Sequence, residues 1–380
     1  MKRIDGVVQH YSWGHRSAIA DLVGRAPSGE PDAELWLGAH PSAPSPTAGS
    51  APLDALIAAD PVGTLGAETA DTHGELPFLL KIIAAAEPLS IQAHPNAAQA
   101  RAGFERENAA GIALDAPDRT YRDANPKPEL VCALTTFEAL CGFRPLAGTR
   151  DLFDALGDGV ESVVERLHGP GTDAEVLADT MAWLLREASE EVVMACLEAC
   201  RMLGRPGWAV EAQTAIDAAT HHGPDPGVVV SLLLNRITLG PGEALALGPG
   251  NLHAYLSGMA VEVMANSDNV VRGGLTRKHV DIDELLAVVD CTPAPPEVQR
   301  PDDWNHRYRS GAKEFTLHRY EVGGGRSVAW QRDAPAIALV TRGAAAANGE
   351  PLERGEALFL AANDEVTFSG DAEVFLATTG

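Results

Sequence analysis

Residues 248–281 read GPGNLHAYLSGMAVEVMANSDNVVRGGLTRKHVD, and this stretch is the most informative part of the chain. Its apolar positions suffice for short strands, while Gly258, Gly273 and Gly274 allow sharp turns or a close backbone approach. Polar and charged residues stand between the apolar ones: His253, Tyr255, Glu262, Asp268, Arg272, Arg277 and Lys278. Ordinary core strands do not mix charges in this way, because a polar group is costly to bury without a partner. The mixture therefore favours a functional site on a β framework over a surface meander with scattered charges.

A second candidate strand is LSIQAH, residues 89–94. Because successive side chains of a strand point to opposite faces, Ser90, Gln92 and His94 are expected on one face. A polar triplet on one face of an apolar strand is a site candidate, and a solvent-facing edge is the alternative. The Ala-rich run that follows predicts a helix, which Asn96 can cap.

The segment DANPKPE, residues 123–129, predicts a turn that leads into an apolar strand at 130–134. Its two prolines favour extended geometry in the residues before them, so we expect Lys127 and Glu129 to be held stiffly. A rigid carboxylate suits a metal ion. Considered alone, the segment would also fit a surface turn with its charges in water.

Five motifs together carry a family resemblance. They are YSWG (residues 11–14), ELWLGAHP (34–41), LSIQAHP (89–95), KPEL (127–130) and YLSGMAVEVMANSDNVVRGGLTRK (255–278). In this order they resemble the type I mannose-6-phosphate isomerases, zinc-dependent phosphomannose isomerases of the cupin fold. The resemblance implies a mainly β chain with two cupin-type double-stranded β-helix (jelly-roll) barrels and an all-helical subdomain.

The helical part is predicted from the spacing of apolar residues, which recur every three or four positions between residues 149 and 223. Helices are expected over 151–156, 160–168, 173–186, 190–203 and 208–222. We therefore expect a helical insertion domain at 149–223, within a discontinuous catalytic cupin domain formed by 1–148 and 224–290. Strands are predicted to resume at 228–239, an apolar run.

A short internal echo points to a second barrel. GEALAL, residues 242–247, recurs as GEALFL at 355–360, which hints at two related barrels. The position of the second copy that corresponds to His253 holds Val366, so a metal is expected in the first barrel alone. The Pro-rich segment 292–296 marks a boundary, and residues 291–380 are predicted to form a C-terminal cupin-like jelly-roll domain with a structural role.

The composition is that of a soluble globular protein, with 380 residues, 45% of them hydrophobic. A formal net charge of -24 speaks against nucleic acid or an anionic membrane as a partner. No apolar run reaches the ~18 to 20 residues of a membrane span, and the first residues lack the apolar core of a signal peptide, so we expect a cytoplasmic location. The cysteines lack metal-site spacing and are expected to be buried free thiols: Cys132, Cys141, Cys196, Cys200 and Cys291.

The family resemblance implies four zinc ligands, Gln92, His94, Glu129 and His253, with one zinc ion per chain. Two imidazoles, a carboxylate and an amide oxygen match the nitrogen and oxygen donors that zinc accepts. Because such sites discriminate poorly among divalent ions, manganese, cobalt or another metal could also occupy this one.

The implied reaction interconverts mannose 6-phosphate and fructose 6-phosphate through a cis-enediol intermediate, as a step of mannose metabolism. Arg272 is our candidate for electrostatic stabilisation of the developing charge. Glu262, Asp268, Lys127 and a water on the metal all remain candidates for the base that moves the proton. For the sugar phosphate, the resemblance points to Ser90 and Lys278, with Tyr255 and Trp13 as further substrate contacts.

One departure from the family concerns residue 126, where many members have a histidine and this chain has proline. We hypothesise that the histidine is dispensable and that Pro126 stiffens Lys127. Rival interpretations are a sugar-phosphate isomerase for another aldose, a non-catalytic sugar-phosphate-binding cupin, and a cupin oxygenase. The oxygenase lacks support, because the compact histidine-rich motif of those enzymes is absent. We expect a monomer.

Overall fold

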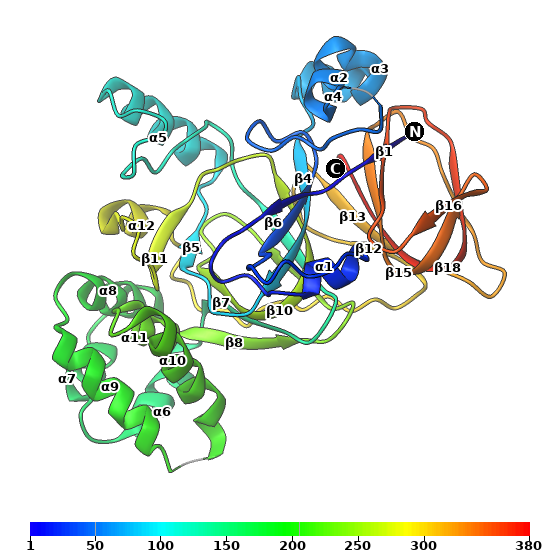
Figure 1. Cartoon of the computed structure of the whole chain (residues 1–380). Coiled ribbons are helices and arrows are strands. Elements are labelled where there is room, and N and C mark those ends of the chain that lie inside the picture. The colour runs from blue at the N-terminus through cyan, green and yellow to red at the C-terminus, as the bar shows by residue number, and fades with distance from the viewer. Residues whose placement is uncertain (50, 205) are drawn as a thin grey trace.

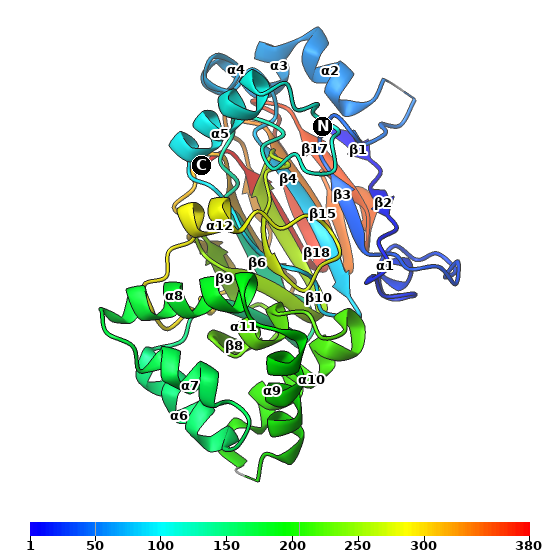
Figure 2. The ribbon, with the colours of Figure 1, turned by 90° about the vertical axis from the view of Figure 1, so that its left-hand side faces the viewer.

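The computed structural model describes residues 1–49, 51–204 and 206–380. Two antiparallel β-sheets stand side by side, and a group of helices lies apart at one end of the first sheet (Figure 1). A view turned by 90° shows these helices gathered beyond the ends of the strands (Figure 2). The predicted architecture, mainly β with two barrel-like units and a helical part, is confirmed.

The first sheet comprises ten described strands. They are β2 (Val7–Gln9), β3 (Glu34–Leu37), β4 (Phe78–Ala85), β5 (Ile91–Ala93), β6 (Glu129–Ala133), β7 (Phe137–Phe143), β8 (Leu234–Leu239), β9 (Ala244–Leu247), β10 (His253–Ala265) and β11 (Val271–Gly274). Strand β10 is central, because its first half pairs with β5 and β7 and its second half with β4 and β6.

Gly258 allows β10 to change partners. The register against β7 shifts between Tyr255 and Ser257, and Gly258 follows with a φ of 109°. A Cβ atom at Gly258 would lie 2.3 Å from the carbonyl oxygen of Thr136, so no other residue fits without a shift of the backbone. This change of partners lets one strand contribute to both halves of the first sheet.

The second sheet comprises eight described strands. They are β1 (Lys2–Ile4), β12 (Asn305–Tyr308), β13 (Thr316–Val322), β14 (Val328–Trp330), β15 (Ala336–Ala347), β16 (Glu350–Glu353), β17 (Ala357–Leu360) and β18 (Val366–Thr378). The two GEAL echoes form β9 and β17, one in each sheet, as the internal repeat predicted. Strand β1 pairs with β17, so the start of the chain joins the second sheet.

A shared apolar core joins the two sheets. Leu80, Leu130 and Val261 of the first sheet pack in one cluster with Leu339 and Phe375 of the second. All five side chains are fully buried. The sheets therefore support each other, and the division into the three predicted domains stays a prediction.

The described helices cover the ends and edges of the sheets. They are α1 (Ala18–Leu22), α2 (Leu53–Ala59), α3 (Pro61–Leu65), α4 (Ala67–Thr72), α5 (Ala97–Ala109), α6 (Leu146–Leu156), α7 (Glu161–Leu167), α8 (Asp173–Arg186), α9 (Glu190–Met202), a 3-10 turn (Pro206–Trp208), α10 (Ala209–His222), α11 (Gly227–Ser231) and α12 (Ile282–Val288). The predicted cap of α5 is confirmed, because Asn96 and Gln99 bond each other's backbone N–H groups. None of the described helices is long and apolar enough to cross a membrane.

The strand predicted at 228–239 is wrong in its first half, where the chain forms α11 before β8 begins. Asp225 starts this turn, because its Oδ1 accepts the N–H groups of Gly227 and Leu275. A Cβ atom on Gly227 would lie 2.5 Å from the nitrogen of Leu275, so the helix packs directly on the end of β11. A short, fully buried apolar run has no periodicity that separates helix from strand.

Candidate metal centre

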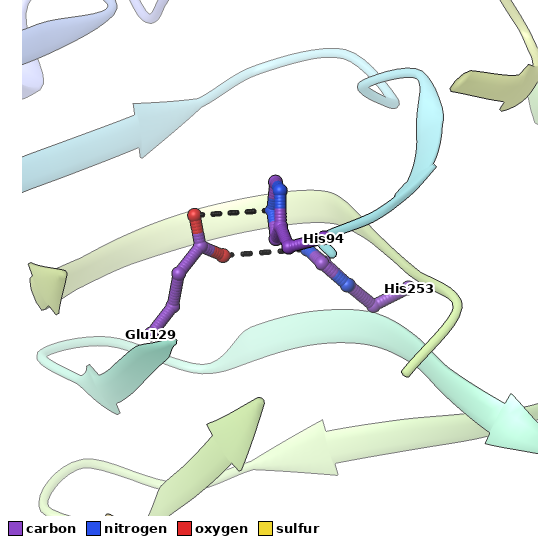
Figure 3. A group of neighbouring side chains, drawn as sticks. All are labelled: His94, Glu129 and His253. Carbon is purple, nitrogen blue, oxygen red and sulfur yellow. Dashed lines mark ion pairs between the residues drawn. The ribbon is translucent and has the colours of Figure 1, made fainter. Parts of the chain in front are cut away.

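Three buried polar side chains converge inside the first sheet (Figure 3). His94 follows β5, Glu129 begins β6 and His253 begins β10. Their candidate ligand atoms all lie within 4.8 Å of one another. His94 Nε2 is 3.2 Å from Glu129 Oε1, and His253 Nε2 is 3.4 Å from Glu129 Oε2. None of the three residues is more than 2% exposed, so the cluster is shielded from bulk water.

Backbone carbonyls fix the orientation of both imidazoles. His94 Nδ1 lies 2.8 Å from the carbonyl oxygen of Asn269, and His253 Nδ1 lies 3.0 Å from that of Asn251. When each Nδ1–H donates to its carbonyl, the Nε2 lone pair of each ring faces Glu129. The two rings therefore present acceptors, as metal-binding histidines do.

Two atoms of this cluster, His94 Nε2 and Glu129 Oε2, have no hydrogen-bond partner among the residues that the structure describes. Buried polar atoms are nearly always paired, so such orphans require an explanation. Two imidazole nitrogens and a carboxylate form a donor set that suits zinc. The residues present therefore fit a divalent cation.

The protonation states of the cluster also fit a cation. Burial lowers the pKa of His94 to about 4, so its imidazole is neutral near pH 7. Burial alone would raise the pKa of Glu129, but His94 and Lys127 outweigh it and hold this pKa well below its usual value. Lys127 Nζ lies 3.3 Å from Glu129 Oε1. His94 and Glu129 are thus deprotonated, as ligands of a metal ion must be.

Gln92, the fourth predicted ligand, lies beside the cluster. It pairs with His253 across β5 and β10, and its Nε2 atom is 3.5 Å from His253 Nε2. Rotating the amide by half a turn would place its oxygen there instead. The structure therefore brings all four predicted metal ligands together.

Ser90, a predicted phosphate contact, lies outside β5 and makes no side-chain hydrogen bond to the described residues.

Next to the metal cluster lies a second buried polar group, formed by Glu34, Lys81, Tyr255 and Glu262 from three neighbouring strands. Lys81 Nζ lies 3.4 Å from Glu262 Oε2 and 3.6 Å from Glu34 Oε2. The Tyr255 hydroxyl donates to Glu262 Oε1 at 2.7 Å. Lys81 and Glu34 were not among the predicted site residues, although a lysine within the apolar strand FLLKIIAA was a usable signal.

Charges and burial oppose each other in this second group. Burial by itself would lower the pKa of Lys81, but Glu34 and Glu262 outweigh it and raise this pKa. Burial and the nearby Glu129 raise the pKa of Glu262, and Lys81 reduces that rise. A carboxyl whose pKa is shifted upward is suited to accept and return a proton.

Asp268 lies toward the surface, whereas its neighbour His40 is buried. His40 Nε2 is 3.5 Å from Asp268 Oδ1, and the Asp268 side chain is half exposed. The hydrogen bond from His40 is the main reason that the pKa of Asp268 is lowered. The Trp13 ring stacks on Tyr11 with 5.7 Å between ring centroids.

A group of cations without acidic partners comprises Arg122, Arg272 and Lys278. Burial and the neighbouring Arg122 lower the pKa of Arg272, and burial, Arg272 and Arg122 lower that of Lys278. Among the residues that the structure describes, none forms an ion pair with these three. Arg272 pairs with Gln92 across β11 and β5, which sets the group beside the metal cluster. Arg122 was not among the predicted site residues, because it lies outside the recognised motifs.

A separate cavity of about 920 Å³ lies between β7, β9 and the segment 290–310. Cys141, Asn251 and Arg307 contribute to its lining, but the metal cluster does not. We therefore place the candidate site by its chemistry rather than by cavity volume.

Comparison with known proteins finds a family and several relatives that share one enzyme name. Residues 1–146 match the family described as phosphomannose isomerase type I, catalytic domain. The mannose-6-phosphate isomerase of Escherichia coli strain K12 is 38% identical over 393 residues, covering 97% of each chain. The mannose-6-phosphate isomerase of Homo sapiens is 31% identical over 405 residues, covering 95% of this chain and 93% of its own.

Solved structures agree along the whole chain. The mannose 6-phosphate isomerase from Salmonella typhimurium bound to fructose 6-phosphate and zinc is 35% identical, with a TM-score of 0.91. The match covers 100% of this chain and 99% of that one. A zinc-bound mannose 6-phosphate isomerase is 34% identical, with a TM-score of 0.90 and the same coverage.

Proposed function

The chain belongs to the type I phosphomannose isomerases, and we propose on this basis that it is a mannose-6-phosphate isomerase, which interconverts mannose 6-phosphate and fructose 6-phosphate. The observation that carries this function is the buried His94–Glu129–His253 cluster with its two unpartnered donor atoms. A non-catalytic binding protein would have no need of the buried acid–base group beside the cluster.

Zinc is the cofactor, and His94, Glu129, His253 and Gln92 would hold it. When bound, a zinc ion supplies Lewis acidity toward the oxygens of the sugar. The carboxylate of Glu129 faces both imidazoles and brings the negative charge that a cation requires. Lys127 keeps this carboxylate ionised and held in place.

We assign the proton transfer between C1 and C2, which passes through a cis-enediol, to Glu262. Its carboxyl is buried, its pKa is raised, and it has fixed partners in Tyr255 and Lys81. Asp268 is less suitable, because its side chain is half exposed and its pKa is lowered. Lys127 is occupied by Glu129. Among the candidates from the sequence, Glu262 is therefore the base that its surroundings favour.

The phosphate is assigned to Ser90 and Lys278, together with the neighbouring Arg272 and Arg122. The protein as a whole repels anions with its net charge of -24, so a phosphate needs a local group of cations. Cations without carboxylate partners are free to bind it. Arg272 pairs with Gln92 across β11 and β5, and we assign it the stabilisation of negative charge that develops on the sugar. Tyr255 and Trp13 complete the substrate contacts.

The remaining assignments rest on the sequence. The protein acts as a monomer in the cytoplasm, with a catalytic domain (1–148 and 224–290), a helical insertion (149–223) and a C-terminal domain (291–380). Pro126 stiffens Lys127 in place of the family histidine.

The deciding experiment measures conversion of mannose 6-phosphate to fructose 6-phosphate before chelator treatment, after it, and after zinc is restored. Glucose 6-phosphate serves as the alternative aldose. Activity that disappears with chelator, returns with zinc and is confined to mannose 6-phosphate supports the function. Conversion of glucose 6-phosphate alone would instead identify a related isomerase.

A further inference from the structure

Asn269, in the segment between β10 and β11, connects two parts of the candidate metal centre. It is fully buried. Its backbone carbonyl accepts the hydrogen bond from His94 Nδ1 at 2.8 Å. Its side chain reaches in another direction, to the backbone of residues 122–125, the loop that precedes Lys127 and Glu129.

Every hydrogen-bonding position of the Asn269 amide is used. Oδ1 accepts the N–H groups of Arg122 at 2.8 Å and Asp123 at 3.3 Å. Nδ2 donates to the carbonyl oxygens of Asp123 and Asn125, both at 2.9 Å. An asparagine amide offers two donors and one oxygen with two lone pairs, so only an amide satisfies these four backbone groups.

The Asp123 side chain makes further hydrogen bonds between the same two segments, 122–125 and 267–269. Its Oδ1 accepts from the Ser267 hydroxyl at 2.8 Å, and its Oδ2 accepts from the N–H of Asp268 at 2.8 Å. The segments 122–125 and 267–269 are thus joined by bonds in both directions. Their relative position is fixed without any contact to a ligand.

Anchoring the loop 122–125 also limits where Glu129 can lie. Pro126 and Pro128 restrict the backbone between Asn125 and Glu129, so Glu129 has little freedom once residues 122–125 are anchored. We propose that Asn269 is a positioning residue, which sets the placement of the Glu129 carboxylate relative to His94 and thereby the affinity for zinc. This inference rests on the proposed metal site.

The rival explanation is that Asn269 only stabilises a loop. A loop anchor would change the thermal stability of the metal-free protein and leave the affinity for zinc unchanged. A positioning residue changes the affinity even when the protein remains folded, because misplaced donors bind the ion less well.

The test is competition for zinc between metal-free protein and a chromophoric chelator, with thermal unfolding measured in parallel. Asn269→Asp keeps the shape and the backbone carbonyl but loses both N–H donors and places a carboxylate beside Asp123. Asn269→Ala removes the amide without adding charge. We expect both variants to bind zinc about 10- to 100-fold more weakly than the unmodified protein.

Two further variants make the outcome decisive. Ser267→Ala removes one hydrogen bond to Asp123 and is expected to weaken zinc binding less than the Asn269 variants do. It tests the inference if the Asn269 variants fail to fold. Thr172→Ala removes the capping box of α8, far from the site, and is expected to lower stability with unchanged zinc affinity.

The outcomes separate the inference from the proposed function. If folded Asn269 variants, or Ser267→Ala where those do not fold, bind zinc within a factor of two of the unmodified protein, the inference is wrong. If the unmodified protein itself fails to bind zinc, the proposed metal site is wrong.

Discussion

Lys81 Nζ lies 3.4 Å from Glu262 Oε2, and both side chains are almost completely buried. The two residues face each other across β4 and β10, in register. Since a buried charge is tolerated only with a partner, each residue depends on the other for its ionised state. The pair sits where the proposed proton transfer takes place, so its electrostatics should govern how activity depends on pH.

Lys81→Met tests this dependence. Lys81 counteracts the rise in the pKa of Glu262, so its removal should raise that pKa further and shift the acidic limb of the pH–rate profile to higher pH. Breaking the buried pair should also cost about 3 to 5 kcal/mol of the free energy of unfolding. Lys313→Met, at an exposed lysine, is the control and should change neither. An unshifted acidic limb would argue against Glu262 as the base.

Zinc removal should affect stability as well as activity. Zinc at about 1,000 times its Kd should raise the free energy of unfolding of the metal-free protein by about 4 kcal/mol, because zinc binds the folded state preferentially. Glu129→Gln removes the charge of the donor set and should lose most of this gain. His168→Gln changes an exposed histidine of the helical part and should keep it. Denaturation with and without zinc measures the difference. A full gain in Glu129→Gln would contradict the ligand assignment.

The proposed phosphate contacts predict an effect on substrate binding. Lys278→Ala should raise KM for mannose 6-phosphate about 10- to 100-fold, since a hydrogen bond to a charged group contributes about 1.5 to 3 kcal/mol. Arg122→Ala should act in the same direction. Arg277→Ala is the matched control, because Arg277 is an exposed cation next to Lys278 in the sequence. Steady-state kinetics at several salt concentrations would measure the effect. An equal rise in KM for Arg277→Ala would point to general electrostatics instead.

Pro126 stands where many family members have a histidine, and substitutions there test whether that histidine is needed. Pro126→His should leave kcat within about twofold, whereas Lys127→Ala should lower it about 10- to 100-fold, because Lys127 supports a metal ligand. The double variant should be no more active than Lys127→Ala alone. Recovery of activity in the double variant would show that a histidine at this position can carry the proton transfer.

His318 should make the stability of the second sheet depend on pH. Burial, followed by Arg307 and Arg332, lowers its pKa from 6.5 to about 4, and its ring packs against Tyr320 and Trp330. Between these two pH values the unfolded chain binds a proton that the folded chain does not. The stabilising effect of the neutral ring is therefore complete above pH 6.5 and is lost as the pH falls toward 4, by about 3 kcal/mol.

The measurement is urea unfolding of chelator-treated protein across this pH range, which excludes the effect of zinc release. His318→Phe cannot be protonated and should show a weaker fall in stability with decreasing pH. His168→Gln, at an exposed histidine of the helical part, is the control and should follow the unmodified protein. Parallel curves for the protein and His318→Phe would rule out this contribution.

Local features of the sequence predicted much of the fold. Helix α8 begins and ends at the predicted residues, because apolar periodicity and the Thr172–Glu175 capping box both act over a few residues. The Asn96 cap was found for the same reason. The prediction failed at 228–239, where neither a period nor a local cap distinguishes a buried helix from a strand.

The family resemblance likewise identified the residues at the metal centre, His94, Glu129 and His253. What brings them together is the pairing of β10 with β5 and β6, which joins residues far apart in the sequence. Lys81, Arg122 and Asn269 carry no local mark, and their importance follows from cross-strand register and from bonds between distant loops. The chemical groups of the site and the starts of most helices and turns could thus be read from the residues alone, since they depend on neighbours along the chain. Which groups meet and which charges are paired depends on packing, because burial and distance are properties of the folded chain.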